Sequence, residues 1–562
     1  MIVGIDLGTT HSLIGAYTEQ GSRLFPNALG DVLTPSVVSV DGDTVLVGQA
    51  ARDRLISHPS HTVAAFKRWM GSSRETRLGE RNFRPEELSA LVLRSLLADA
   101  EAALGEKIAE AVISVPAYFS DAQRKATRSA GELAGVRVER LINEPTAAAL
   151  AYGLQNREQE SRFLIFDLGG GTFDVSILES FDNVFEVHAS AGDNFLGGED
   201  FLDVMVEAFC QDHALRRQAM SPQEYGQLRR RMEALKREIG GTAVAPLQIA
   251  IGENNYSWTI DEDRFARLCE PLVQRMRAPI ERAMRDAKLQ PAQLDEIVLV
   301  GGASRMPLVA RLVSRMFGRL PLRHINPDQA IALGACVAAG LKSRNAKLDE
   351  IILTDVCPYT LGTQIGRRDP SGQVHNGYFH PIILRNSTVP ISREDVFYPI
   401  HEQQHKLTID IFQGENPLVA NNIKLGEISL DLDKRRSHDE NGVTVRFTYD
   451  INGLLQVEVT EHATQRRHEL LLEQNPGLLT PEEIRARLAA LAELKVHPRD
   501  QQENIAVLAR AERLYEEFLH ERGQLQDWIM QFRAILDTQD VTRIAHHRSQ
   551  LAEALDALEA QV

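Results

Sequence analysis

The first 345 residues alternate short apolar runs with amphipathic segments of helical period. The apolar runs predict strands over residues 2–6, 12–17, 111–115, 163–167, 173–179 and 297–301. The amphipathic segments predict helices over residues 87–104, 121–134, 145–153, 199–213, 224–239, 263–286 and 328–341. Strands that alternate with helices in this way are typical of an α/β domain.

The pattern of hydrophobic and polar positions changes after about residue 355. Short alternating runs cover residues 381–385, 395–400, 406–412, 424–430, 443–449 and 454–460. Turn residues such as Asn452-Gly453 separate these runs, and no segment of helical period lies between them. We therefore predict a compact antiparallel β domain, a β-sandwich.

The chain returns to a helical pattern from residue 479 onward. Thr480 is a candidate N-cap, Pro481 suits the first helical position, and Glu483 completes a capping box. Amphipathic helices are predicted over residues 499–524 and 540–560. We expect these helices to form an appendage and not the core of the whole protein.

These patterns divide the chain into four parts. We predict a duplicated α/β domain at 1–345, a linker at 346–357, a β-sandwich at 358–475 and a helical lid at 476–562. The linker lacks the glycine, serine and proline of a flexible tether. It carries Ile351, Ile352 and Leu353 between charged residues, which predicts a segment that docks in at least one state.

Charge and cysteine usage narrow the class of protein. The chain has 62 Lys and Arg residues against 78 Asp and Glu residues, for a formal net charge of −16. An acidic surface argues against nucleic acid or an anionic membrane as the main partner.

The cysteines form no C-x-x-C pair and have no histidine cluster beside them, which favours buried thiols in a reducing compartment over zinc ligation. They are Cys210, Cys269, Cys336 and Cys357.

The ends and apolar runs of the sequence bear on its location. Residues 2–6 form a strand-like run that leads into a polar turn, unlike the basic start and apolar stretch of a signal peptide. No run of 18 apolar residues is long enough to span a membrane. We predict a cytoplasmic location.

One hairpin occurs twice in the α/β domain. Residues 2–10 and residues 163–172 each consist of an apolar strand, then Asp-Leu-Gly, then small and hydroxyl residues, and a second apolar strand follows each copy. A single copy is equally well explained as an ordinary hairpin turn. Two copies in matching positions indicate a duplicated fold.

The composition of the two loops suits a polyphosphate. Glycine lets the backbone approach phosphates closely, and backbone N–H groups and threonine hydroxyls donate to phosphate oxygens. Asp6 and Asp174 can hold Mg²⁺ through water molecules, because Mg²⁺ dehydrates reluctantly. A third glycine turn, Gly301-Gly302, ends a buried strand and suits an adenosine contact. The sequence therefore predicts an ATP-binding cleft between two related lobes.

Six motifs, in order along the chain, resemble the signatures of one family. They are residues 4–10, 115–119, 143–149, 167–174, 197–201 and 300–302. Together they resemble the seventy-kilodalton heat-shock chaperones, over residues 2 to about 500. The short lid, the compact first lobe and the linker at 352–359 look most like the heat-shock cognate C (HscC) branch. The resemblance implies a multidomain protein with an actin-like duplicated α/β ATPase domain, an antiparallel β-sandwich and an α-helical lid.

The resemblance implies slow ATP hydrolysis, in which water attacks the γ-phosphate in line. Lys67 matches a lysine that contacts the γ-phosphate and the water, Glu144 a glutamate that orients water, and Thr172 a threonine near the γ-phosphate. From the residues alone, Lys67 is more often a solvated surface lysine and Glu144 a carboxylate stabilised at a helix N-terminus. Asp6 and Asp174 complete the catalytic set. The implied cofactors are ATP or ADP, Mg²⁺ and, as an open alternative, K⁺.

The resemblance also implies which residues hold the nucleotide. Those near the phosphates are Gly8, Thr9, Thr10, His11, Gly169, Gly170, Gly171, Thr172, Gly197, Gly198 and Glu199. Those on the adenosine side are Glu233, Lys236, Arg237, Gly301, Gly302, Arg305 and Asp328. The spacing of Glu233, Lys236 and Arg237 puts them on one helix face, which without the resemblance favours a solvated charged stripe. His11 stands where asparagine is common, and Gly240 stands where serine is.

Residues that couple the domains are implied in the same way. Pro116 and Arg124 match a switch that links nucleotide state to domain docking, and Asp355 matches the linker aspartate. Thr354 replaces a leucine. A hydroxyl left unpaired in a docking apolar strip costs about 1–3 kcal/mol, which predicts weaker or differently tuned coupling.

The β domain contains the implied peptide pocket. Phe397, Leu407 and Ile409 match positions that line it. Leu407 and Ile409 face one side of a strand, a pattern that alone favours plain core. Thr363 falls where a large apolar residue is typical, and Ile365 or Gly366 falls near another, which predicts a less apolar pocket.

The function implied is that of an ATP-regulated chaperone for unfolded or extended polypeptides, active in protein folding and the stress response. A J-domain co-chaperone and a nucleotide-exchange factor are partners by resemblance alone, and neither nucleic acid nor membrane is expected. Two alternatives share paired phosphate loops: a small-molecule kinase and a filament-forming actin-like protein. Both leave residues 355–562 without a role.

Overall fold

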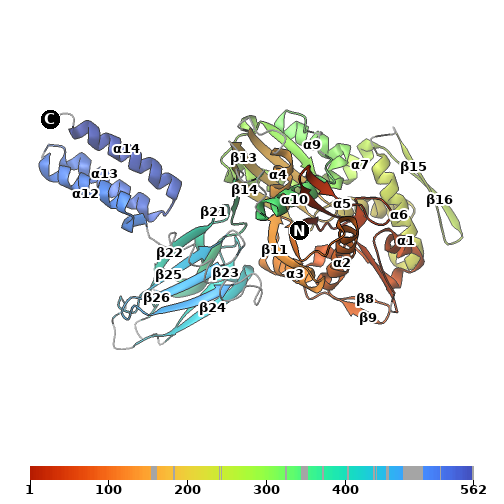
Figure 1. Cartoon of the computed structure of the whole chain (residues 1–562), viewed down its shortest axis with the longest axis horizontal. Coiled ribbons are helices and arrows are strands. Elements are labelled where there is room, and N and C mark those ends of the chain that lie inside the picture. Colours follow the sequence, from red (N-terminus) through yellow and green to blue (C-terminus); the bar gives the residue numbers. More distant parts are fainter. Residues whose placement is uncertain are drawn as a thin grey trace. The chain divides into compact units, whose positions relative to one another are not determined.

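The protein is described by a computed structural model, which divides into two compact units, Met1–Pro358 and Tyr359–Val562 (Figure 1). The structure describes residues 1–42, 44–153, 161–181, 184–239, 241, 244–322, 326–343, 348, 352–369, 373–401, 404, 406–433, 437, 439–450, 453, 455–472, 498–518 and 520–559. Each unit is considered by itself.

The first unit has two lobes, each built around a mixed sheet. The first sheet has the order β11-β10-β1-β2-β3 with β4 paired to β2, and the second sheet includes the order β17-β12-β13-β14-β18. The strands of the first sheet are β1 (Ile2–Asp6), β2 (His11–Thr18), β3 (Gly21–Leu24), β4 (Thr34–Pro35), β10 (Glu110–Val115) and β11 (Arg137–Asn143). Those of the second are β12 (Ser161–Leu168), β13 (Phe173–Phe181), β14 (Val184–Asp193), β17 (Glu296–Val300) and β18 (Ile352–Val356).

The two sheets repeat one topology. Strand β1 runs antiparallel to β2 and parallel to β10, and strand β12 runs antiparallel to β13 and parallel to β17. The duplication predicted from the two Asp-Leu-Gly hairpins is therefore present in the fold. The six predicted strands of this region are also confirmed, with their ends shifted by no more than the usual one or two residues.

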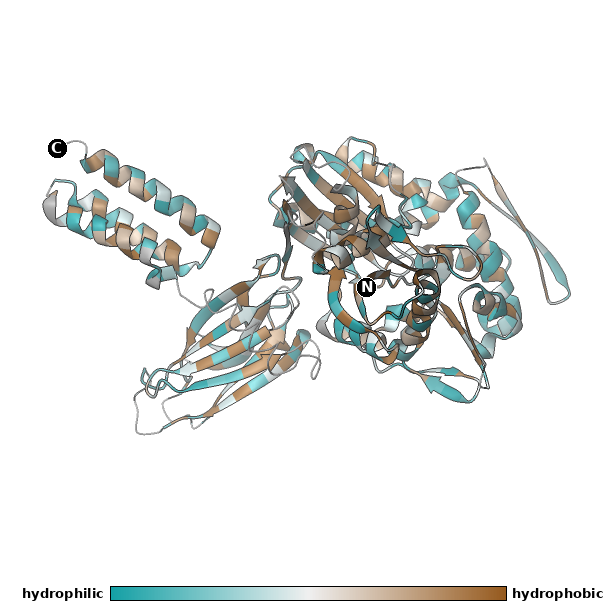
Figure 2. Cartoon of the chain, in the orientation of Figure 1, coloured by the Kyte–Doolittle hydropathy of each residue, from teal (hydrophilic) through white to brown (hydrophobic). Residues whose placement is uncertain are grey.

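Helices pack against both sheets and between them. They are α1 (Gln49–Ser57), α2 (Pro85–Leu104), α3 (Asp121–Leu133), α4 (Glu144–Gly153), α5 (Gly198–Asp212), α6 (Pro222–Glu238), α7 (Glu262–Leu268), α8 (Glu270–Asp286), α9 (Pro307–Phe317) and α10 (Ala330–Lys342). Helices α4 and α10 share one apolar cluster with strands of both lobes. They approach so closely that a Cβ on Gly334 would lie 1.7 Å from the Ala147 carbonyl oxygen. Figure 2 shows hydrophobic residues concentrated on the central strands of this unit.

Two features of the first unit differ from the sequence prediction. The helix predicted over 263–286 is broken at Cys269 into α7 and α8, because Pro271 in the first turn of α8 has no N–H to continue the preceding helix. A hairpin of β15 (Ala245–Ile251) and β16 (Asn254–Ile260) was not predicted. Its apolar residues alternate with exposed ones around a turn at Gly252, so the period-2 signal was present.

Short elements complete the first lobe and hold part of the site. The strands are β5 (Val37–Asp41), β6 (Thr44–Val47), β7 (Thr62–Ala64), β8 (Thr76–Leu78) and β9 (Arg81–Phe83). A 3₁₀ turn, η2 (Phe66–Trp69), follows β7. This tight turn carries the candidate catalytic lysine.

The second unit begins with two four-stranded antiparallel sheets, ordered β20-β19-β23-β24 and β22-β25-β26-β27. Their strands are β19 (Leu361–Arg368), β20 (Val374–Ile383), β22 (Ile391–Phe397), β23 (Lys406–Gln413), β24 (Ile423–Asp431), β25 (Val443–Tyr449), β26 (Leu455–Glu461) and β27 (Arg467–Leu472). These sheets are the predicted β-sandwich. The short strand β21 (Thr388–Val389) also belongs to this unit.

Three helices end the described chain: α12 (Gln502–Glu517), α13 (Arg522–Asp537) and α14 (Val541–Glu559). They share an apolar cluster that includes Leu514, Phe532 and Leu555. The continuous helix predicted over 499–524 was wrong, because α12 ends before Phe518 and α13 begins at Arg522. The predicted helix start at Thr480, Pro481 and Glu483 lies outside the described residues.

Candidate functional site

A cavity of about 470 Å³ lies between the two lobes of the first unit, a size suited to a small organic ligand. Both phosphate loops, helix α6 and the turn after β17 line it. Of the predicted site residues, those lining it are Asp6, Gly8, Thr9, Thr10, His11, Lys67, Glu144, Gly169, Gly170, Thr172, Gly198, Glu199, Glu233, Lys236, Arg237, Gly301, Gly302, Arg305 and Asp328. The structure thus brings together residues more than 300 positions apart in the sequence.

The two phosphate loops meet inside this cavity. A Cβ on Gly170 would lie 1.8 Å from the Thr10 hydroxyl oxygen, which belongs to the other lobe. Gly301 has a φ of 81° and a Cβ there would lie 2.4 Å from the Leu168 carbonyl oxygen. Any larger residue at either position would push the loops apart, which explains why the loops are glycine-rich.

Lys67 and Glu144 form a buried ion pair at the cavity floor. The Lys67 ammonium lies 2.8 Å from Glu144 Oε1, and the two side chains are only 4% and 7% exposed. The ammonium also lies 5.5 Å from the centre of the Phe119 ring. Lys67 is therefore not a solvated surface lysine, and Glu144 does more than stabilise the N-terminus of α4.

Three aspartates crowd the same region, and all three are buried. Burial, followed by the charge of Glu144, raises the pKa of Asp6 to about 7 and that of Asp174 to about 7. The pKa of Asp167 is raised well above its usual range for the same reasons. Asp6 accepts a hydrogen bond from the Ser114 hydroxyl at 2.9 Å.

One oxygen on each of two aspartates has no hydrogen-bond partner. These are Oδ2 of Asp167 and Oδ2 of Asp174. An unpaired buried carboxylate oxygen is costly, and a cation or its water shell would satisfy it. No group of three or more His, Cys, Asp or Glu side chains converges on a single metal position among the described residues. The two unpartnered carboxylate oxygens fit a cation that binds through its water shell, as Mg²⁺ commonly does.

Asp167 lines the cavity but was not among the predicted site residues. The signal for it was available, since Asp167 occupies in the second hairpin the position that Asp6 occupies in the first. Asp174, which was predicted, lies behind the cavity wall, where its Oδ1 accepts from the Tyr118 N–H at 3.2 Å.

Of the three predicted charged residues of α6, Lys236 is buried and Glu233 half-buried, while Arg237 is exposed, so they do not form a uniformly solvated stripe. The Lys236 ammonium lies 2.7 Å from a Glu233 oxygen and donates to the Gly198 carbonyl at 2.9 Å. Arg237 also pairs with Glu233, at 2.9 Å. Lys236 therefore ties α6 to the loop beside the second phosphate loop. Gly240 lies outside the described residues.

Three further predicted residues also line the cavity: Arg305, Asp328 and His11. Arg305 pairs with Asp328 at 2.6 Å, and the same guanidinium donates to the Asn326 side chain. Burial, followed by the charges of Arg52 and Arg237, lowers the pKa of His11 to about 4. His11 is therefore neutral at pH 7, and one ring nitrogen is available as a donor.

Gly171 and Gly197 do not line the cavity but support its loops. A Cβ on Gly171 would lie 2.7 Å from Cγ of Arg68. The Gly197 N–H donates to Oδ2 of Asp200 at 2.8 Å. All of the predicted phosphate-side residues thus lie in or directly beneath the site.

The predicted switch residues connect the site to the linker. The Arg124 guanidinium donates to the Ala117 carbonyl, just after Pro116, at 3.1 Å and to Oδ1 of Asn143 at 2.7 Å. The Asn143 amide donates in turn to Oδ2 of Asp355 at 2.9 Å. Because Asn143 directly precedes Glu144, one peptide bond separates this chain of contacts from the lysine–glutamate pair.

The linker docks on the second lobe as a strand. Residues 352–354 of β18 pair in parallel with residues 184–186 of β14. The Thr354 hydroxyl donates to the Phe185 carbonyl at 3.3 Å, so it does not carry the penalty expected of an unpaired hydroxyl. Burial raises the pKa of Asp355. Ile351 lies outside the described residues.

The predicted peptide-binding residues lie on the two sheets of the sandwich. Leu407 and Ile409 of β23 are buried, and Phe397 of β22 is half-buried with its ring 5.4 Å from that of His380. Thr363 is fully buried, and its hydroxyl donates to the Asp410 carbonyl at 2.8 Å. The polar group at this position is therefore satisfied within the sheet.

The four cysteines are buried and form no disulfide. Burial raises the pKa of Cys269 to about 12 and that of Cys336 to about 12, so these thiols are poor nucleophiles. Within the described residues, no helix is both long and apolar enough to cross a membrane.

A duplicated α/β fold whose two phosphate loops close on one cavity defines the actin-like ATPases as the class to which the first unit belongs. The comparisons with known proteins identify the family. The family model described as "Hsp70 protein" matches residues 2–78 and 73–562. The chain therefore belongs to the Hsp70 family, whose members are ATPases that act as ATP-dependent chaperones.

Several curated relatives are similar over most of their length. The chaperone protein DnaK of Thermotoga neapolitana is 37% identical, with 97% of this chain and 94% of the relative aligned. The chaperone protein dnaK3 of Thermosynechococcus vestitus is 41% identical, with 87% and 75% aligned. The chaperone protein DnaK of Mycoplasma mobile is 36% identical, with 91% and 85% aligned.

Proposed function

We propose that this chain is a chaperone that hydrolyses ATP in the cavity between the two lobes of its first unit. The observation that supports this best is the buried pair of Lys67 and Glu144 where the two phosphate loops meet. Lys67 would contact the γ-phosphate, Glu144 would orient the attacking water, and Thr172 would lie beside the same phosphate. A positive charge and a carboxylate held in a site shielded from water act more strongly than they do in solution.

Asp6, Asp167 and Asp174 would hold Mg²⁺ through water, and Mg²⁺ bound there would neutralise charge on the phosphates. Their buried, partly unpaired carboxylates and raised pKa values support a nearby cation. K⁺ is a second candidate for the same acidic region. On the adenosine side, we assign the base and ribose to α6 and to the turn that contains Arg305.

The contacts from Arg124 through Asn143 to Asp355 would carry the nucleotide state to the linker. When the linker docks or leaves, Asn143 gains or loses a partner one residue from Glu144. Because linkage is reciprocal, a client that shifts the linker must also shift nucleotide binding.

The second unit would bind unfolded or extended polypeptide on its β-sandwich through Phe397, Leu407 and Ile409, with the helices as a lid. We assign the parts of the chain as 1–345, 346–357, 358–475 and 476–562. A J-domain co-chaperone, a nucleotide-exchange factor and a cytoplasmic location complete the proposal. Within the family we place the chain in the heat-shock cognate C branch, on the resemblance of its linker at residues 352–359.

The test is single-turnover ATP hydrolysis by the full chain, with and without a panel of unfolded peptides and a J-domain protein. We expect both additions to stimulate hydrolysis, and Thr172→Ala to abolish the stimulated rate. A hydrolysis rate that neither peptide nor J-domain protein changes would contradict the chaperone cycle. Stimulation by sugars would favour a small-molecule kinase, and ATP-dependent sedimentation of polymers would favour a filament.

A further inference from the structure

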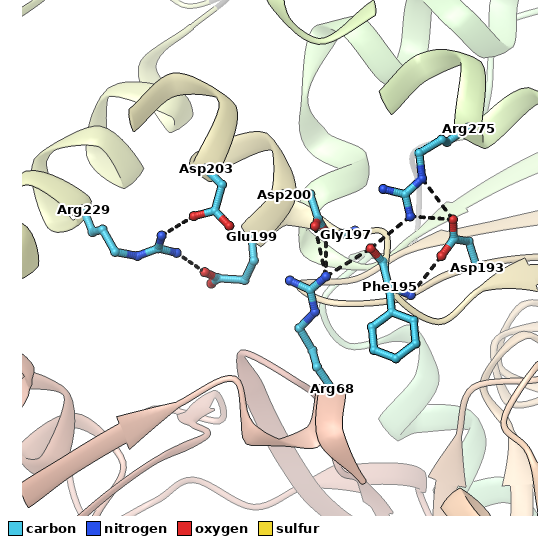
Figure 3. Close-up of polar contacts among 9 residues, drawn as sticks. All are labelled: Arg68, Asp193, Phe195, Gly197, Glu199, Asp200, Asp203, Arg229 and Arg275. Carbon is cyan, nitrogen blue, oxygen red and sulfur yellow. Dashed lines mark hydrogen bonds and ion pairs between the residues drawn. The ribbon is translucent and has the colours of Figure 1, made fainter. Parts of the chain in front are cut away.

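Arg68 directly follows Lys67 on the η2 turn of the first lobe but is bonded to the second lobe (Figure 3). Its guanidinium nitrogen Nη2 lies 3.0 Å from Asp200 Oδ1 and 3.1 Å from Asp200 Oδ2. The same nitrogen donates to the Phe195 carbonyl at 3.0 Å. The arginine and aspartate side chains are 15% and 19% exposed, so water screens this pair only partly.

Asp200 in turn supports the second phosphate loop. Its Oδ2 accepts from the Gly197 N–H at 2.8 Å and so caps the N-terminus of α5. The next two backbone N–H groups, those of residues 198 and 199, donate to the carbonyls of Gly169 and Gly170, each at 2.9 Å. The Asp200 carboxylate therefore holds α5 against the loop that faces the nucleotide cavity.

The stem of Arg68 also contacts this loop. A Cβ on Gly171 would lie 2.7 Å from Cγ and 3.0 Å from Cδ of Arg68. The aliphatic part of Arg68 thus contacts the second phosphate loop, and its guanidinium bonds Asp200 of α5. A lysine could supply the charge but not the planar group with several fixed donors.

The other two arginines drawn in Figure 3 differ from Arg68 in one respect. Arg275 of α8 bonds Asp193 and the Phe195 carbonyl, and Arg229 of α6 bonds residues of α5. Both arginines and all of these partners belong to the second lobe. Of the three, Arg68 alone joins the lobes, so Arg275 offers a matched control on the same loop.

We propose that Arg68 is a positioning residue for ATP hydrolysis, which fixes the turn that carries Lys67 to the second phosphate loop. The inference rests on the hydrolytic role proposed for Lys67. Lys67 sits on the first lobe, while Thr172 and the loop glycines sit on the second. The bond between Arg68 and Asp200 fixes the distance between Lys67 and the second phosphate loop. The transition state depends on this distance more strictly than ground-state binding does.

Trp69, the next residue on the turn, offers a direct readout of this contact. Its ring lies 5.9 Å from that of Phe195, the residue whose carbonyl Arg68 bonds. The chain has three tryptophans, and the other two, Trp258 and Trp528, belong to β16 and α13. Replacing these two with phenylalanine leaves Trp69 as the sole indole emitter in the full chain.

The experiment compares Arg68→Ala, Arg68→Lys and Arg275→Ala in the full chain. Single-turnover hydrolysis gives the rate constant, and titration calorimetry gives the dissociation constant for ADP. We expect Arg68→Ala to lower the rate constant about ten- to a hundredfold, with ADP affinity changed less than about threefold. Arg68→Lys should recover only a part of the rate, and Arg275→Ala should change it less than about threefold.

Two further measurements separate positioning from general damage to the fold. In the single-tryptophan background, Arg68→Ala should increase quenching of Trp69 by acrylamide, and Arg275→Ala should not. In a double-mutant cycle with Asp200→Asn, the second substitution should have little further effect on the hydrolysis rate once Arg68 is replaced. Additive losses would mean that the two residues act separately and would overturn the inference.

Lys67→Met, measured in parallel, separates this inference from the proposed function. If Lys67→Met keeps the wild-type rate, the hydrolytic role of Lys67 fails and the inference that rests on it fails with it. If Lys67→Met abolishes hydrolysis while Arg68→Ala behaves like Arg275→Ala, the inference about Arg68 fails alone. An equal loss of rate and ADP affinity in Arg68→Ala would also overturn it, because the role would then be structural.

Discussion

Replacement of Lys67 by methionine tests how strongly the site depends on the buried pair of Lys67 and Glu144. Methionine keeps most of the length of lysine but carries no charge. Glu144 is then left buried without its partner, beside Asp6, Asp167 and Asp174. No other cation within hydrogen-bond distance of Glu144 is present among the described residues.

The expected loss of stability is large for a single side chain. Removal of one partner from a buried ion pair costs about 3–5 kcal/mol, because the remaining charge is neither solvated nor paired. The matched control is Lys342→Met, since Lys342 is 47% exposed and its partner Glu139, at 3.4 Å, also pairs with Arg137 at 2.6 Å. A pair exposed to this extent contributes about 1 kcal/mol or less. The losses for the two lysines should therefore differ by about 2–5 kcal/mol.

The assay is equilibrium unfolding in urea without nucleotide, followed by tryptophan emission. Trp528→Phe in every variant confines the signal to the first unit, which contains the other two tryptophans. The double variant Lys67→Met/Glu144→Gln provides a further check. It should recover about 1–3 kcal/mol relative to Lys67→Met, because glutamine leaves no buried charge unpaired.

One result would refute this reasoning. If Lys67→Met lowers the free energy of unfolding by no more than Lys342→Met, the pair of Lys67 and Glu144 is effectively solvated. The low exposure of the two side chains would then not describe the protein in solution. Failure of the double variant to recover any stability would point to the same conclusion by a separate route.

The remaining predictions concern coupling, pH and the loop contact. Asn143→Ala should reduce peptide stimulation of ATP hydrolysis about fivefold or more in single-turnover assays while the unstimulated rate changes little, because it removes the amide between Arg124 and Asp355. Since the pKa of His11 is about 4 when folded and about 6.5 when unfolded, the unfolded chain binds more protons between these values. The pKa values of Asp6 and Asp174, about 7 when folded, act in the opposite direction, so the test is a comparison of two chains. Between pH 7 and pH 5, wild type should lose about 2 kcal/mol of unfolding free energy relative to His11→Asn, and equal pH slopes in the two chains would contradict the assignment. Gly170→Ala should weaken ADP binding at least about tenfold by calorimetry, because its new methyl would clash with the other phosphate loop; wild-type affinity would show that the loops do not touch.

The duplicated core could be predicted because its signals are local. Within each Asp-Leu-Gly hairpin, the turn and its flanking apolar runs lie within a few residues of each other, and both hairpins appear in the structure. The same comparison of the two copies would have predicted Asp167, which stands opposite Asp6 in the repeat. The prediction for the second loop named Asp174, seven positions later, and not Asp167.

Burial of charged residues could not be predicted in this way. Lys67 and Glu144 are 77 positions apart, and Lys236 and Gly198 are 38 apart, so no window of sequence reveals that they touch. Local charge patterns favoured a solvated lysine in each case, and long-range packing decided otherwise. The role of Thr354 was uncertain for the same reason, because its hydroxyl partner is a backbone carbonyl 169 positions away.

The docked linker also protects the sheet that receives it. Strand β14 would otherwise present a row of unpaired backbone N–H and C=O groups along its edge, and such edges invite pairing with other chains. Parallel pairing with residues 352–354 covers part of that row. The strand also carries Glu186 and His188 on its half-buried face, where charged or polar side chains discourage foreign strands. Docking of the linker thereby replaces part of the edge of β14, a ten-residue strand, with that of β18, which has five residues. A short edge strand offers an unfolded client less backbone to pair with.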